Sequence, residues 1–373
     1  MIDTFFSRPF RGNLSKALVL LLALVWGIPF FSCNQDPIFY EISFEVKPLE
    51  PRIEGTPTTL VQCKDSFYVG SRFSETLYEY SDARWKTLPE QPGGPIIDIA
   101  ATDDPGTLYA LTGNPGTLTL RKKDMVTDST WETIRNHADY PVLQSLYADA
   151  TLLFLGAQKK IGDNTYAILY YDSENNTLQI VKEGTKLLTG AAFLGSTHYL
   201  ATSGDGIIKV TDPASPDDAP ADTAPNNIIG LVRVNSRIVA VSSDGYMLYS
   251  DSGAFTPVST GYHFTGALAL WKKDEVQLLL LGIHGTGSST THGYREILLQ
   301  NGELDLGTMG LRTPGNEDPS SVSNRDIYNS TLGKHPVISM IQAPDTTLFA
   351  ATAKNGVWSY RQRDGEWQWN AEE

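Results

Sequence analysis

The residues that could perform chemistry are few and lie far apart along the chain. Four aspartates lie between residues 212 and 222, but this segment lacks the glycine and the alternate ligand spacing of a calcium-binding loop. His284 and His292 flank a run of glycine, serine and threonine, and two histidines are fewer ligands than a zinc site needs. No glycine-rich turn opens a helix and no nucleophile elbow is present. The sequence therefore predicts no metal, no cofactor and no catalytic residue.

The first 32 residues have the composition of a targeting segment. Basic residues precede the apolar run at 17–25, which is shorter than a comfortable membrane span and is typical of a signal peptide. Cys33 directly follows Phe30, Phe31 and Ser32, and this string resembles a bacterial lipobox, in which the cysteine receives diacylglycerol on its sulfur. The two phenylalanines depart from the usual leucine and small residue. The alternatives are an ordinary secretory signal and an uncleaved anchor.

Cysteine content and charge narrow the class of protein further. The chain has two cysteines, so a lipidated Cys33 leaves Cys63 as a lone thiol, and its apolar neighbours predict that it is buried and inert. The formal net charge is −14. This charge argues against nucleic acid as a partner and against adsorption to an anionic lipid surface. It permits a cationic partner, although acidity also simply keeps an exported protein soluble.

The elements that would position any site are short strands that recur along the chain. In the last copy, residues 337–369, four short runs are separated by turns, two of which are Asn355-Gly356 and Asp364-Gly365. Both pairs favour the positive φ that tight hairpin turns require, so the copy predicts a four-stranded antiparallel meander. Inner strands are expected to begin near Thr59, Ile96, Leu143, Leu188, Ile228, Gly266 and Val337. The spacing is near-constant except for the last interval, which contains the polar segment 310–335, and it is typical of propeller blades.

Two turns carry a family resemblance. SDSGAF at 250–255 and RDGEWQW at 363–369 are similar to degenerate Asp-boxes, the turn elements of BNR-type propellers. Together with the lipobox-like string and the acidic composition, the chain resembles bacterial propeller lipoproteins of spirochaete-type envelopes. The resemblance implies a propeller, and the seven repeats predict an all-β fold with a single propeller of seven four-stranded blades. Six blades, eight blades and a pair of β-sandwiches are the alternatives.

The expected organisation has three parts. Residues 1–32 form the signal peptide, and residues 33–55 form the lipidated cysteine and a tether with one possible strand. Residues 56–373 form the propeller, with polar insertions at 212–226 and 310–335. Long loops on a rigid scaffold are where recognition usually resides. The candidate binding residues are therefore Trp271, His284, His292 and Tyr294, with Arg312 and Arg325 of the second insertion.

These features predict a lipid-anchored protein of the bacterial cell envelope that faces the periplasm or the exterior. Its propeller would bind a protein or glycan partner as a scaffolding module. The alternative is a glycosidase-like hydrolase with its site in the central funnel. Converging carboxylates or arginines there would favour the hydrolase, whereas a flat or apolar funnel would favour binding. The nearest string to a sialidase arginine setting, Pro51-Arg52-Ile53-Glu54, departs from it at the proline and precedes the first blade.

Overall fold

The computed structural model divides the chain into two units, Met1–Leu49 and Glu50–Glu373. Everything below concerns the second unit, because the first lies outside the described residues. The structure describes residues 53, 56–103, 106–127, 129–149, 151–214, 226–250, 254–286, 292–300, 303–304, 332, 335–363 and 366–372. The possible strand within residues 33–55 and Cys33, the predicted site of lipidation, fall outside these ranges.

The first three blades are built from consecutive strands. Blade 1 contains β1 (Val61–Cys63), β2 (Ser66–Gly70), β3 (Leu77–Ser81) and β4 (Arg84–Thr87). Blade 2 contains β5 (Ile96–Thr102), β6 (Thr107–Thr112), β7 (Thr119–Asp124) and β8 (Glu132–Ile134). Blade 3 contains β9 (Val142–Ala148), β10 (Leu153–Gln158), β11 (Tyr166–Asp172) and β12 (Thr177–Thr185).

The remaining blades follow the same order. Blade 4 contains β13 (Leu188–Leu194), β14 (Thr197–Thr202) and β15 (Gly206–Val210), and blade 5 contains β16 (Ile228–Val234), β17 (Arg237–Ser242), β18 (Tyr246–Ser250) and β19 (Thr256–Ser259). Blade 6 contains β20 (Tyr262–Lys273), β21 (Val276–Thr286), β22 (Gly293–Gln300) and β23 (Glu303–Leu304). Blade 7 contains β24 (Val337–Gln342), β25 (Leu348–Thr352), β26 (Val357–Arg363) and β27 (Glu366–Ala371).

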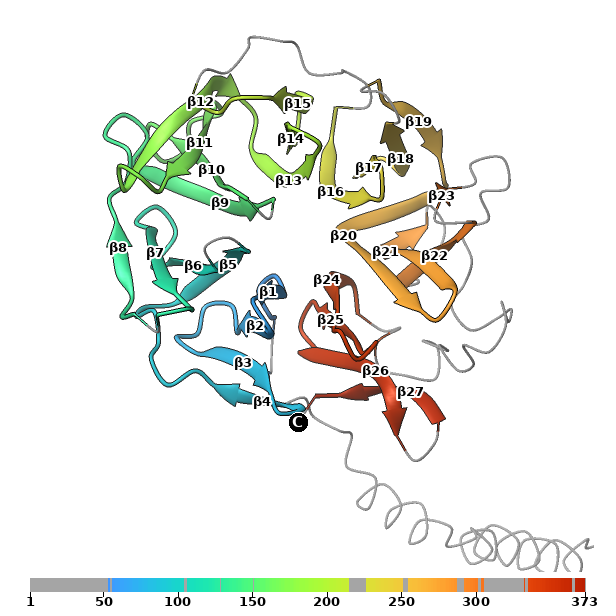
Figure 1. Cartoon of the computed structure of the whole chain (residues 1–373). Coiled ribbons are helices and arrows are strands. Elements are labelled where there is room, and N and C mark those ends of the chain that lie inside the picture. The colour runs from blue at the N-terminus through green and yellow to red at the C-terminus, as the bar shows by residue number, and fades with distance from the viewer. Residues whose placement is uncertain are drawn as a thin grey trace, which may run out of the picture. The chain divides into compact units, whose positions relative to one another are not determined.

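Each sheet is an antiparallel meander, and Figure 1 shows the seven sheets around a common axis with their first strands innermost. The fold is a seven-bladed β-propeller, which confirms the predicted architecture. Six sheets have four strands, and blade 4 has three within the described residues. Four of the predicted inner-strand starts, Ile96, Leu188, Ile228 and Val337, are the first residues of β5, β13, β16 and β24. Residues 215–225, within the first predicted insertion, lie outside the described ranges.

The hydrophobic core is distributed between neighbouring blades. The second strands are buried along most of their length, and β6, β10 and β25 are buried at every residue. A strand that is covered on both faces reads as a continuous apolar run, which explains sequences such as LFAAT. Each blade therefore needs the blades on both sides to bury its faces. Cys63 lies in this core at 1% exposure, and burial raises the pKa of its thiol to about 11. The expectation of a buried cysteine is confirmed.

Side chains close the ring between the first and last blades. Phe349 of blade 7 packs against Tyr80 and Trp85 of blade 1, with ring centroids 4.7 Å and 5.4 Å apart. The backbone N–H of Leu60 donates to Ser339 Oγ at 3.0 Å. Each blade consists of consecutive strands, so among the described residues no sheet joins the two ends of the chain. Aromatic packing thus performs the closure that shared strands perform in other rings.

A buried polar pair joins blades 3 and 4. His198 Nδ1 lies 2.5 Å from Asp149 Oδ2, and the two side chains are 8% and 0% exposed. Asp149 Oδ1 also accepts hydrogen bonds from the backbone N–H of Leu152 and from both the N–H and the hydroxyl of Thr151. The carboxylate therefore fixes the turn after β9 as well as the position of the next blade.

Candidate functional site

The seven inner strands enclose a central channel, and a repeated irregularity shapes its wall. The pairing of first and second strands shifts register at corresponding places in four blades, between Ile96/Asp98, Leu188/Gly190, Ile228/Gly230 and Val337/Ser339. Such β-bulges turn the chain and re-aim the following side chains. We call the side of the ring where the inner strands begin the entry face, and the opposite side the exit face. The loops between second and third strands lie on the entry face.

Glycine allows two of the blades to approach each other closely at the channel wall. A Cβ atom on Gly230 of blade 5 would lie 2.3 Å from the carbonyl oxygen of Gly266 in blade 6. Gly266 has a φ of +90°, a conformation that other residues rarely adopt. These two positions are therefore fixed by the packing of backbone against backbone.

A cavity of about 560 Å³ occupies the entry side of the channel. Its lining combines the segment 56–60 before β1 with residues of the other six inner strands, and it includes three larger polar side chains, Arg72, Asp98 and Tyr147. Asp98 Oδ1 accepts hydrogen bonds from the backbone N–H groups of Thr59 and Ile99, both at 3.0 Å. Burial nevertheless raises the pKa of this carboxyl, because desolvation outweighs the two donors. Burial also raises the pKa of the Tyr147 phenol, and the charge of Asp98 adds to this effect.

A second cavity of about 330 Å³ lies toward the exit face and shares Thr59, Leu60, Tyr147 and Ala148 with the first. Its lining contains one carboxylate, Asp103. Neither channel cavity therefore holds a pair of carboxylates within the described residues. Glycoside hydrolysis in its usual form requires two carboxyl groups across the bond that is cleaved. Among the described residues, each of the two adjoining cavities is lined by one carboxylate, Asp98 in the first and Asp103 in the second.

A third pocket, of about 340 Å³, lies between blades 2 and 3 and does contain two carboxylates, Asp124 and Glu132. Asp124 is bonded by the N–H of Val126 and by the N–H and hydroxyl of Thr127, and these donors lower the pKa of its carboxyl. Glu132 lies 3.4 Å from Lys122, which also donates to Tyr171 Oη at 2.9 Å. Both carboxylates thus have structural partners, and Asp124 is poorly suited to act as a general acid.

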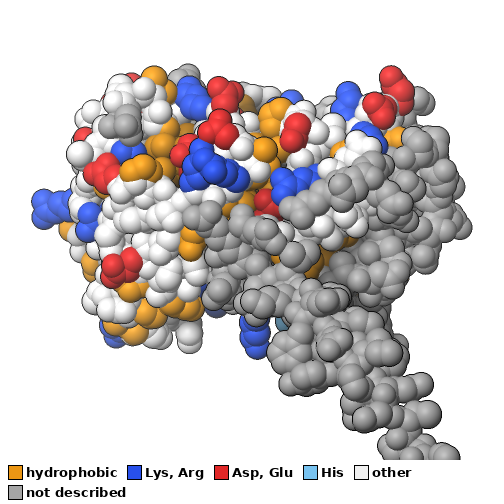
Figure 2. Space-filling model, turned by 90° about the horizontal axis from the view of Figure 1, so that it is seen from below, with side chains coloured by type: hydrophobic (Ala, Val, Ile, Leu, Met, Phe, Trp, Pro, Cys, Tyr) orange, Lys and Arg blue, Asp and Glu red, His pale blue; other side chains and the backbone are white. Residues whose placement is uncertain are grey.

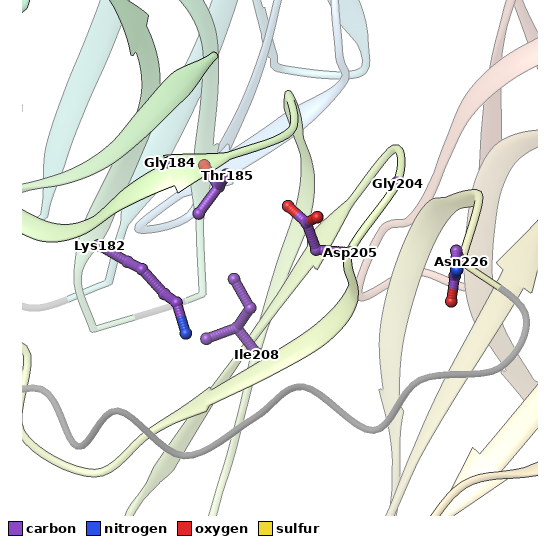
Figure 3. Close-up of a pocket in the computed structure, with 7 residues that line it drawn as sticks. All are labelled: Lys182, Gly184, Thr185, Gly204, Asp205, Ile208 and Asn226. Atoms are coloured by element: carbon purple, nitrogen blue, oxygen red, sulfur yellow. The ribbon is translucent and has the colours of Figure 1, made fainter.

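Figure 3 shows a further depression, of about 380 Å³, between blades 3 and 4. Lys182 of β12 and Asp205 of the turn after β14 line it from two sides, with Ile208 of β15 between them. Asp205 Oδ2 accepts the backbone N–H of Lys186 at 2.6 Å. The carboxylate therefore ties the turn of blade 4 to the segment that enters it.

The structure places the predicted binding residues in different environments. Trp271 and Tyr294 are 1% and 0% exposed, and Trp271 Nε1–H donates to the carbonyl of Thr346 at 2.9 Å. These two side chains pack the core between blades 6 and 7 instead of forming a contact surface. The sequence predicts a surface position for Trp271 and Tyr294, but each lies on a strand face that the neighbouring blade covers.

The two predicted histidines lie at the entry-face end of blade 6. The His284 ring is exposed and stacks on His263 at a centroid distance of 5.8 Å. His292 is half-buried, and its Nδ1 has no hydrogen-bond partner among the described residues. No group of three metal-ligating side chains occurs in the described part of the chain. Arg312 and Arg325 lie outside the described residues.

Sequence reasoning missed the exposed apolar side chains. Four large hydrophobic residues are exposed in the described ranges: Phe73 at 65%, Ile161 at 69%, Val126 at 61% and Tyr246 at 38%. Phe73, Ile161 and Tyr246 lie at the loops between second and third strands, on the entry face, whereas Val126 lies on the exit face. Figure 2 shows the ring from the side, where acidic and basic side chains are interspersed.

Comparisons with known proteins agree on the fold. The chain superposes on a streptogramin B lyase structure with a TM-score of 0.53 at 11% identity, covering 82% of this chain and 93% of that one. It superposes on the WD40 β-propeller domain of Doa1 with a TM-score of 0.54 at 12% identity, covering 84% and 95%. No known protein family and no curated protein matches the sequence. At such identities the likeness shows the propeller fold alone.

One further observation concerns the membrane. Within the described residues, no helix has the length and hydrophobicity that crossing a bilayer requires.

Proposed function

We propose that this protein is a binding module, a lipid-anchored propeller of a bacterial envelope that presents its entry face to a protein or glycan partner. The observation that carries this proposal is the channel lining. Among the described residues, its entry cavity is lined by one carboxylate, Asp98, and the Oδ1 atom of that carboxylate already accepts two backbone N–H groups. A rigid ring whose channel cavities each show one carboxylate among the described residues is better suited to recognition than to hydrolysis.

The anchor rests on the sequence alone, because Cys33 directly follows the apolar segment and a small residue. Metabolic labelling with palmitate of the full chain and of Cys33→Ser tests it. We expect label in the wild-type protein and none in the variant. Equal labelling of the two proteins would remove lipidation of Cys33 from the proposal.

The partner surface is tested by replacing part of the second insertion. Leu332 is fully buried in the core of blades 6 and 7, and the N–H of His335 donates to its carbonyl oxygen at 3.4 Å. The replacement should therefore cover residues 310–330 with a Gly/Ser linker of equal length and leave Leu332 in place. If the insertion forms the contact, capture of the partner is lost while thermal stability is unchanged. Capture that survives the replacement assigns the contact to another part of the surface.

Catalysis is tested directly at the channel. A panel of glycoside substrates should show no turnover with the full chain. Turnover that disappears in Asp98→Asn would contradict a binding role, because it would make the channel carboxyl a catalytic residue.

A further inference from the structure

Two strongly exposed apolar side chains flank blade 2 on the entry face. Phe73 stands on the loop between β2 and β3, and its backbone N–H donates to the carbonyl of Ile96, the first residue of blade 2, at 2.8 Å. Ile161 stands on the loop between β10 and β11, and it reaches Gly116 on the corresponding loop of blade 2. Loops of blades 1 and 3 thus lean onto the same blade from its two sides.

The backbone at Phe73 holds the ring in the solvent. Its φ is +65°, a left-handed conformation that is an outlier for a bulky side chain. Neighbouring hydrogen bonds fix the loop, since the N–H of Arg72 donates to the Thr56 carbonyl at 2.8 Å and that of Ser71 to the Thr76 carbonyl at 3.1 Å. Strained residues persist where the surroundings determine them, and they concentrate at functional sites. An exposed aromatic ring on a rigid loop also loses little entropy on binding.

Gly116 makes room for the second apolar side chain. A Cβ atom there would lie 2.5 Å from Ile161 Cδ1, and Gly116 itself has a φ of +90°. The isoleucine side chain therefore rests against a glycine backbone while 69% of its surface remains exposed. Gly93 and Gly94 lie in the segment that leads into β5 of blade 2, and both have a positive φ, of +77° and +82°.

Each apolar side chain has a cationic neighbour in the sequence. Arg72 precedes Phe73 and is exposed, and its Nε–H donates to the carbonyl of Ile97 at 3.0 Å. Lys159 lies two residues before Ile161, with its Nζ 5.1 Å above the ring of Tyr140. Among the described residues neither cation has a carboxylate within 4.0 Å, although the chain carries a net charge of −14. The charge of Arg72 acts on Asp98, with which it lines the entry cavity, and Lys159 contacts Tyr140. Both side chains are exposed, so each can also pair with a carboxylate of a ligand.

We propose that Arg72, Phe73, Lys159 and Ile161 form a docking platform for a segment of a partner protein in which an apolar side chain is flanked by aspartate or glutamate. Apolar side chains of the segment pack against Phe73 on one side of blade 2 and Ile161 on the other, and the carboxylates pair with Arg72 and Lys159. This inference rests on the proposed binding function and names the partner class and the surface. An aliphatic side chain at one of the two apolar positions favours a peptide over a glycan, because sugars bind through aromatic stacking and hydroxyl contacts.

The test uses the full chain in detergent and a displayed library of random peptides as the probe. Selected peptides are synthesised, and their Kd is measured for the wild type, Phe73→Gly, Ile161→Ser and Arg72→Gln. Val126→Ser is the matched control, because Val126 is as exposed as Phe73 but lies on the exit face. Circular dichroism and the unfolding midpoint confirm that each variant is folded. The same proteins are applied to a glycan array.

The expected result is enrichment of peptides with an apolar residue next to Asp or Glu. Their binding should weaken at least about tenfold in Phe73→Gly and in Ile161→Ser and remain unchanged in Val126→Ser, as for truncation of anchoring residues at other interfaces. Peptide binding that is equal in Phe73→Gly, Ile161→Ser and the wild type would overturn the platform and leave the proposed function standing. Glycan binding without any enriched peptide would overturn the partner class. Failure of every probe to bind would count against the proposed function itself.

Discussion

Phe73 gives the sharpest physical prediction, because the order of stability of two substitutions should be reversed there. At ordinary positions in a fold, a protein with alanine is more stable than one with glycine by about 0.4–1 kcal/mol, because glycine makes the unfolded chain more flexible. Phe73 has a φ of +65°, where a residue with a Cβ atom carries about 1–2 kcal/mol of strain that glycine does not. The difference favours Phe73→Gly over Phe73→Ala by about 1 kcal/mol.

The loss of the ring itself should have little effect on this comparison. Phe73 is 65% exposed, and both variants remove the same aromatic contacts. The wild type and Phe73→Gly should therefore differ by less than about 1 kcal/mol, since the relief of strain offsets the lost burial and the added entropy. A typical core phenylalanine costs about 3–5 kcal/mol when it is truncated.

Equilibrium unfolding in urea measures these differences. The control is Val126, which is 61% exposed and whose φ is not positive, so Val126→Ala should there be more stable than Val126→Gly. The reasoning predicts opposite orders at the two positions. If Phe73→Ala proves as stable as Phe73→Gly or more so, the loop is not strained and the argument for a held, exposed ring is refuted.

Three further substitutions test the channel and the contacts between blades. Burial raises the pKa of Asp98 in the folded state, so above that pKa the charged carboxylate lowers the stability of the fold. This loss of stability vanishes below the pKa of the unfolded state, about 4. Asp98→Asn should therefore be more stable than the wild type at neutral pH, and the difference in melting temperature should close as the pH falls toward 4. Asp149→Ala leaves His198 buried without its partner and should cost about 3 kcal/mol in urea unfolding, whereas a loss below about 1 kcal/mol would contradict the role of this pair. Gly230→Ala places a Cβ atom against the Gly266 backbone and should destabilise the protein by about 3 kcal/mol. Gly195→Ala is the control: its Cβ atom meets no atom within 4 Å, but Gly195 has a φ of +67°, so this variant measures backbone strain alone.

The ring of sheets was predictable because its cause is local. Short apolar runs that end in small polar turns, such as the run before Asn355-Gly356, are coded within a few residues and repeated in every blade. The starts of β13 and β16 could therefore be predicted to the residue. The number of strands in each sheet followed from the same pattern, apart from blade 4, where the residues between β15 and β16 are only partly described.

The site was less predictable because its causes are not local. Trp271 and Tyr294 were expected on a surface, but which face of a strand is covered depends on the neighbouring blade. Asp98 faces the channel after a bulge in β5, and a register shift of this kind has no strong signature in the sequence. Phe73 occupies a loop that reads as an ordinary polar turn, and that loop is held by hydrogen bonds from the N–H of Arg72 to Thr56 and from the N–H of Phe73 to Ile96. The pair Arg72-Phe73 in that loop was the available hint.

Hydrogen exchange on the full chain, with and without a selected peptide, tests the central claim of a binding surface on the entry face most directly. Protection of backbone amides should increase in the loops at 71–76 and 159–165, on either side of blade 2, because the peptide covers them. The exit-face loop of blade 2 near Val126 should be unchanged. Increased protection confined to the exit face, with no change at 71–76, would contradict the account.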